Sequence, residues 1–95
     1  MHYELSNEYL VDWPIWGPTG GVNDSEPALP PLLHTDVKAW ARNFNQGYSH
    51  QTGWSSAEVA AAHHREGLRL EAAIRTAIWP DAHSVTLRYW ETQHE

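Results

Sequence analysis

The chain has no cysteine, one methionine and one phenylalanine, and its six bases are outnumbered by 12 acids. Without cysteine it forms neither a disulfide nor a thiolate metal site, and a small core without disulfides suits a reducing interior. The formal net charge of −6 opposes non-specific binding to nucleic acid, which requires clustered Lys and Arg. No apolar run approaches the roughly 20 residues that span a bilayer. We therefore expect neither a nucleic-acid nor a membrane partner.

The amino-terminal residues Met1–Leu5 lack the basic and apolar regions of a secretory signal, so we expect a cytoplasmic protein. A length of 95 residues allows a single domain, 1–95, with a modest core. Six tryptophans and four tyrosines compensate for the small size, because each buried aromatic side chain removes roughly 150–250 Å² from water.

Two segments alternate between apolar and polar residues, which is typical of half-buried strands. The first strand is predicted over 2–12, with an apolar face of Tyr3, Leu5, Tyr9 and Val11 and a polar face of His2, Glu4, Ser6, Glu8 and Asp12. Asn7 and Leu10 interrupt this alternation and indicate a bend or bulge. The second strand is predicted over 83–91, where Val85 and Leu87 share one face.

A long connection, 13–31, carries five prolines and three glycines and is predicted to be an irregular loop. Two helices are predicted to follow it, over 32–46 and 56–79. The buried stripe of the first is Leu33, Val37, Trp40, Ala41 and Phe44, and that of the second is Val59, His63, Gly67, Leu70, Ile74 and Ile78. Gly67 costs roughly 1 kcal/mol relative to Ala within a helix, which predicts close packing against Trp40 or a strand.

The resulting expectation is an α+β fold in the order β-α-α-β. The terminal strands would form a two-stranded antiparallel sheet, covered on one face by the helical hairpin. Two strands alone are marginal in water, and their outer edges stay open to another chain. A homodimer that joins the strand edges of two copies is therefore one expected assembly.

The Tyr-rich first strand, the Trp13-Pro14-Ile15-Trp16 box, Ala39-Trp40-Ala41 and the stretch from Glu66-Gly67-Leu68 to Ile74 resemble a group of small uncharacterised actinobacterial proteins, also found in phages of the same hosts. Members of that group carry an early Trp-Pro-Leu-Trp box, a Leu-Arg-Ala-Trp helix and a glycine-containing second helix followed by a Val-x-Tyr strand. Here Ile15 stands in place of leucine, and Val37-Lys38-Ala39-Trp40 in place of Leu-Arg-Ala-Trp. The resemblance implies the fold and a cytoplasmic origin, leaves a phage accessory role open, and implies no site residue.

Histidine is abundant, but its spacing does not indicate a metal site. His63 and His64 are adjacent on a helix and point about 100° apart, and no second pair has ligand spacing. We expect neither a metal nor another cofactor. No nucleophile elbow, phosphate loop or dinucleotide fingerprint is present. An enzymatic or ligand-binding alternative remains, in which His63, Glu66 and a carboxylate such as Asp36 line a pocket between the 13–21 loop and the second helix.

The aromatic residues favour a non-catalytic role in binding another protein. Tryptophan is enriched at the energetic centres of interfaces, and four tryptophans are predicted on loops or on a polar strand face: Trp13, Trp16, Trp54 and Trp90. The competing interpretation is that Trp13 and Trp16 fold back and cap the core. Acids flank the aromatic loop at Asp12, Asp24 and Glu26, which favours a basic partner surface. Small inhibitors and immunity proteins share this acidic character. A comparison of function with them is an analogy.

Overall fold

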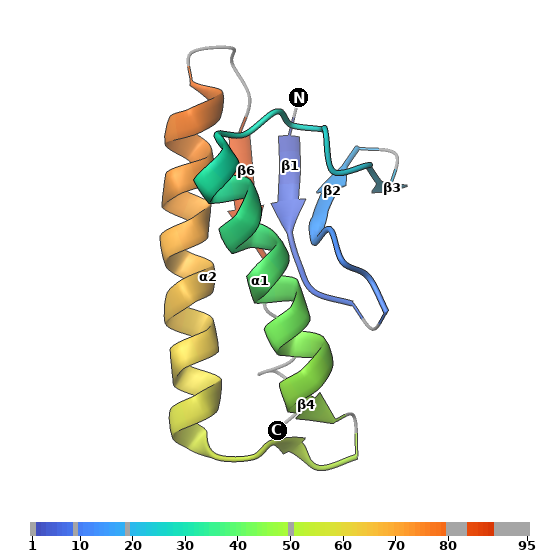
Figure 1. Ribbon diagram of the computed structural model, residues 1–95, viewed down its shortest axis with the longest axis vertical. Coiled ribbons are helices and arrows are strands. Elements are labelled where there is room, and N and C mark those ends of the chain that lie inside the picture. Colours follow the sequence, from blue (N-terminus) through green and yellow to red (C-terminus); the bar gives the residue numbers. More distant parts are fainter. Residues whose placement is uncertain (1, 9, 19, 50, 80–83, 89–95) are drawn as a thin grey trace.

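A computed structural model describes residues 2–8, 10–18, 20–49, 51–79 and 84–88 of the chain (Figure 1). The fold is α+β, as expected. Two helices, α1 (Pro31–Gly47) and α2 (Ala57–Ile78), lie side by side on one face of a small sheet. Between them the chain reverses through a short hairpin of β4 (Tyr48–Ser49) and β5 (Gly53–Trp54).

The sheet in the described part of the chain has four strands in the order β3-β2-β1-β6, namely Gly20–Gly21, Ile15–Gly17, His2–Leu5 and Ser84–Leu87. Strand β1 pairs antiparallel with β2 and parallel with β6. The prediction of a two-stranded antiparallel sheet is therefore wrong, both in the number of strands and in the relative direction of the terminal ones. The segment 13–31 is likewise not one loop, because it contains β2 and β3.

Strand β2 explains why the two terminal strands run parallel. It returns the chain antiparallel to β1, so that α1 starts at the end of the molecule where β1 starts (Figure 1). The helical hairpin brings the chain back to this same end, and β6 then runs in the direction of β1. Without β2, the same two helices would have led into an antiparallel pair, which is the arrangement that the sequence pattern predicted.

The first strand is shorter than the predicted 2–12, because β1 ends at Leu5. Asn7, the polar residue on the predicted apolar face, lies beyond the end of β1. It is 1% exposed, and its side chain contacts His63. The second predicted strand, 83–91, corresponds to β6, and its residues 83 and 89–91 lie outside the described residues.

The core lies between the sheet and the helices. Inward-facing side chains of the strands meet the buried stripes of α1 and α2, and the main cluster consists of Tyr3, Leu5, Trp13, Ile15, Val37, Trp40, Leu70, Ile74, Ile78 and Val85. A second cluster at the β4–β5 end consists of Phe44, Tyr48, Trp54 and Ala60. His63 connects the two clusters, since its ring stacks on Trp40 at 4.7 Å and contacts Trp54 at 4.6 Å between ring centroids.

The close packing predicted at Gly67 is confirmed. A Cβ atom built there would lie 2.9 Å from Trp40 Cζ2 and 3.3 Å from Leu87 Cδ2. Real Cβ atoms essentially never approach another heavy atom at the shorter of these distances. The absence of a side chain at Gly67 therefore lets α2 meet both α1 and β6, which compensates for the poor helix propensity of glycine.

The outer edge of β6 is partly occupied by a helix side chain. The amide of Arg88 donates to the Leu5 carbonyl on β1, so the amide of Leu87 faces the opposite edge, where it donates to Glu71 Oε2 at 2.6 Å. A carboxylate in this position is one way in which proteins blunt an exposed strand edge. A homodimer joined through the edge of β6 would first have to displace Glu71.

Leu10 occupies an unusual place in the connection between β1 and β2. Leu10 has a φ of 66°, a left-handed conformation that is rare for leucine. It is 97% exposed. The turn is closed by the Val11 amide donating to the Glu8 carbonyl at 3.3 Å. Asn45 of α1 holds it from both sides, by accepting from the Leu10 amide at 2.8 Å and donating to the Val11 carbonyl at 3.0 Å.

We expect Leu10→Gly to raise the free energy of unfolding by about 0.5–1 kcal/mol. Relief of the left-handed strain outweighs the extra conformational entropy of glycine in the unfolded chain. The change is measured by urea denaturation. Leu32→Gly is the matched control, because Leu32 is also exposed but lies in the first turn of α1, where glycine lowers stability. A Leu10→Gly variant less stable than the wild type would contradict the prediction.

Candidate functional site

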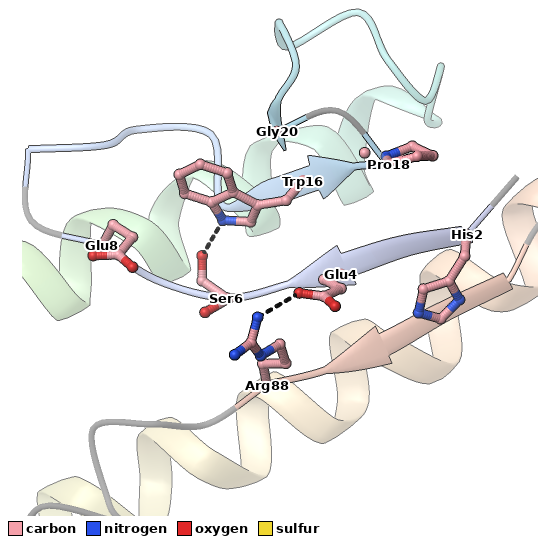
Figure 2. Close-up of a pocket in the computed structure, with 9 residues that line it drawn as sticks. His2, Glu4, Ser6, Glu8, Trp16, Pro18, Gly20 and Arg88 are labelled. Carbon is pink, nitrogen blue, oxygen red and sulfur yellow. Dashed lines mark hydrogen bonds and ion pairs between the residues drawn. The ribbon is translucent and has the colours of Figure 1, made fainter.

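The face of the sheet that points away from the helices carries a hollow of about 420 Å³ (Figure 2). Alternation along β1 places Tyr3 and Leu5 in the core and His2 and Glu4 on this open face. We call the site the open-face hollow and define it by its lining residues: His2, Glu4, Ser6, Glu8, Trp16, Gly17, Pro18, Gly20 and Arg88. They come from β1, β2 and β3 and from residues that follow β1, β2 and β6, so the sheet and its connections form the site.

Trp16 is the largest side chain in the open-face hollow, and its ring is held in place. The indole Nε1–H of Trp16 donates to the carbonyl oxygen of Ser6 at 2.8 Å, which ties β2 to the end of β1 (Figure 2). On β3, Gly21 is the register partner of Trp16, and a Cβ atom there would contact the ring at 3.4 Å. The ring is therefore half-buried, with a fixed orientation and with part of its surface lining the hollow.

The charges around Trp16 are mainly negative. Arg88 Nη1 lies 3.0 Å from Glu4 Oε2, and Figure 2 shows the two side chains pointing toward each other. The parallel pairing of β1 with β6 creates this contact between residues 84 positions apart. Glu8 is exposed on the same rim and forms no ion pair within the described residues. The hollow thus combines two carboxylates with one guanidinium that is already paired.

Two of the four tryptophans predicted to contact a partner are buried, which corrects the prediction for them. Trp13 is 5% exposed, packs in the main cluster and donates its indole N–H to the Glu26 carbonyl at 3.0 Å. Trp54 is 7% exposed and packs against Phe44 in the second cluster. The capping interpretation thus describes Trp13, whereas Trp16 alone of this set lines a surface hollow in the described part of the chain. Trp90 lies outside the described residues.

Asp24, one of the three acids expected to attract a basic partner, is engaged within the chain. Asp24 is 3.2 Å from Lys38 Nζ and 3.5 Å from His34 Nε2, both on α1. Hydrogen bonding and Coulombic attraction from Lys38, with a smaller contribution from His34, lower the pKa of Asp24. The charge of Asp24 is therefore balanced within the chain, and the carboxylates beside Trp16 are those of Glu4 and Glu8.

The structure does bring His63 and Glu66 to one hollow, of about 360 Å³, together with Asp36. This hollow lies between α1 and α2, however, and not beside the 13–21 loop as predicted. Arg69 neutralises its acids, by donating to both carboxylate oxygens of Glu66 at 2.7 Å and to Asp36 Oδ2 at 2.9 Å. The two carboxylates are consequently engaged in a surface ion-pair network.

His63 is engaged through both of its ring nitrogens. The Asn7 Nδ2 group donates to His63 Nε2 at 2.9 Å, and His63 Nδ1–H donates to Asn43 Oδ1 at 2.8 Å, which defines a neutral imidazole. Burial, with a smaller contribution from His64, lowers the pKa of His63 from 6.5 to about 4. A general base with such a pKa is weak at neutral pH. The contacts of His63 are those of a packed structural residue.

Several residues of the open-face hollow were not singled out from the sequence, although a signal existed for some of them. The alternation of 2–12 had already placed His2, Glu4, Ser6 and Glu8 on one polar face. What was missing was β2, which brings Trp16 opposite Glu4 in the register. Arg88 joins the same face through the pairing of strands from opposite ends of the sequence, which no local pattern reveals.

Two findings concern metal ligation and membrane spans in the parts of the chain that the structure describes. Among those residues no three His, Asp or Glu side chains gather in a way that would hold a metal ion. Neither of the described helices has the length and apolar character needed to cross a membrane.

In sequence comparisons, no protein-family model matches the chain. A search of curated proteins also finds no match.

Proposed function

We propose that this protein is a non-catalytic recognition module that binds a segment of another protein across the open face of its sheet. The observation that carries the proposal is the half-buried Trp16 ring, fixed by its hydrogen bond to Ser6 within a hollow on the face that α1 and α2 leave free. A ring held in one orientation loses little conformational entropy when a partner covers it, so its desolvation contributes efficiently to affinity.

A catalytic role receives less support from the same geometry. His63 has both ring nitrogens engaged, while Glu66 and Asp36 are bound by Arg69. In the open-face hollow, Glu4 is paired with Arg88. General acid–base catalysis requires a positioned group that is free to exchange a proton with substrate. The open-face hollow offers instead an aromatic surface with charged groups at its rim, which is the usual composition of a recognition site.

The proposal is tested by selecting displayed peptides against the purified protein and measuring the affinity of the enriched peptides for two tryptophan variants. We expect Trp16→Ala to weaken binding by about 30-fold, the effect of losing an interface residue worth about 2 kcal/mol. Trp79→Ala is the matched control, because Trp79 is 74% exposed at the end of α2, away from the open-face hollow. Peptides that bind Trp16→Ala as tightly as the wild type would contradict the proposal.

A further inference from the structure

We propose that the group recognised in the open-face hollow is an arginine side chain of the partner, with its guanidinium on the Trp16 ring and beside the carboxylate of Glu8. This inference rests on the proposed recognition function and specifies the chemistry of its partner. It requires three properties of the hollow: an aromatic surface, an available negative charge, and a reason for preferring a guanidinium to other groups.

The aromatic surface and the negative charge are both on the rim of the same hollow. The indole of tryptophan attracts a cation placed over its face more strongly than other aromatic rings do. Glu8 contributes an exposed carboxylate that has no ion pair within the described residues. The formal net charge of −6 adds a long-range attraction for a basic segment and a repulsion for an acidic one.

One guanidinium of the chain already lies in the hollow, paired with a carboxylate. Arg88 lines it and places its guanidinium 3.0 Å from Glu4. We infer that Arg88 is an internal occupant that satisfies one of the two carboxylates and leaves the other, Glu8, for the partner. A guanidinium is planar, more weakly hydrated than an ammonium and able to stack on an indole, so the fixed ring of Trp16 favours arginine over lysine.

An anionic ligand fits the same hollow poorly. Arg88 is the only Lys or Arg among the lining residues, and Glu4 already neutralises it. Bringing a phosphate or carboxylate beside Glu4 and Glu8 would place like charges together, which disfavours binding. A neutral apolar side chain would contact Trp16 but would leave the carboxylate of Glu8 without a partner.

The test uses acetyl-arginine methylamide as probe, with the citrulline analogue as a neutral isostere and the lysine analogue as a second cation. Binding to the full chain is followed by NMR through the indole Nε1–H signal of Trp16, assigned by its loss in Trp16→Phe. We expect the arginine probe to shift this signal, with an affinity that falls as salt is added. The citrulline probe should produce no saturable shift. Equal affinity for the lysine or the citrulline probe would overturn the assignment.

Two charge variants test the roles of the carboxylates separately. Glu8→Gln should weaken binding of the arginine probe by about twofold to fivefold, the range for an exposed ion pair. Arg88→Gln should strengthen binding by a similar factor, because it frees Glu4 for the probe. Circular dichroism establishes that both variants are folded. Weaker binding by a folded Arg88→Gln would show that Arg88 is no internal occupant and would overturn the inference.

The selected peptides separate this inference from the proposed function. One outcome is that selected peptides need Trp16 and an arginine of their own to bind the wild type, and bind Glu8→Gln more weakly. Such peptides support both the recognition function and the arginine assignment. Peptides that require Trp16 yet bind Glu8→Gln as tightly as the wild type would overturn the arginine assignment and leave the recognition function standing. Peptides that do not require Trp16 would overturn both.

Discussion

Trp40→Ala is expected to lower the free energy of unfolding by about 3–5 kcal/mol, the typical cost of removing a large aromatic side chain from a core. Trp40 is 2% exposed, stacks on His63 with 9° between the ring planes, and donates its indole N–H to the His63 carbonyl at 2.9 Å. It also fills the space beside Gly67. Its removal therefore leaves a cavity where α1 and α2 meet, and it takes away the indole donor to the His63 carbonyl.

The measurement is urea denaturation followed by circular dichroism, with Trp16→Ala as the matched control. The same deletion at Trp16 should cost less, about 1–3 kcal/mol, because it removes one hydrogen bond, to Ser6, and a ring that is only half-buried. The difference between the two losses of stability thus distinguishes Trp40, a core residue, from Trp16, a residue at the surface. Equal losses of stability would show that Trp16 is a core residue and would remove the basis of the recognition surface.

The helices were predictable because their signals are local. Apolar residues at helical spacing place them over 32–46 and 56–79, and the structure has them at Pro31–Gly47 and Ala57–Ile78. The second helix begins where the side chain of Ser56 accepts from the Val59 amide, a cap that depends on neighbours in the sequence. The close approach at Gly67 was also predictable, since a glycine within a helix indicates that a side chain there would obstruct a neighbour.

The sheet was not predictable in the same way, because its shortest strands depend on partners distant in sequence. Strand β2 has three residues, Ile15–Gly17, and prolines stand immediately before and after it. Such a segment resembles a loop until β1 is placed beside it. A prediction without β2 also gives β6 the wrong direction relative to β1. The one unpredicted strand therefore accounts for both errors in the sheet, the number of strands and the direction of the terminal ones.

The unpredicted strand β2 also explains why the sequence did not distinguish the buried Trp13 from the half-buried Trp16. Once β2 is known, alternation places Trp16 on the face opposite Ile15, and Trp13 is on the side of Ile15, in the core. The sequence alone offered two indoles in one loop and no basis for separating them. The composition of the site was partly accessible, through the polar face of 2–12, but its geometry required the sheet. The contact between Arg88 and Glu4 could not be predicted from any local pattern.

The second large effect concerns pH and depends on His63. Its pKa is lowered to about 4 in the folded protein, mainly by burial and further by His64, from 6.5 for an unperturbed histidine. Between these pH values the unfolded chain binds a proton at His63 that the folded chain does not. Folding stability therefore rises with pH across this window, and it is lost as the pH falls from about 6.5 to about 4. The full loss from this one group is about 3 kcal/mol.

We expect the wild type to show this loss in urea denaturation between pH 7.5 and pH 4, and His63→Gln to lack most of it. Glutamine has no proton to gain in this range, so the variant starts from a lower stability, having lost the stacked ring, but has a shallower pH dependence. Every other ionisable group is the same in both proteins, so the difference between the two slopes isolates His63. Equal slopes, or an NMR titration of His63 centred near pH 6.5, would mean that its ring accepts a proton in the folded state and is not held neutral by Asn7 and Asn43.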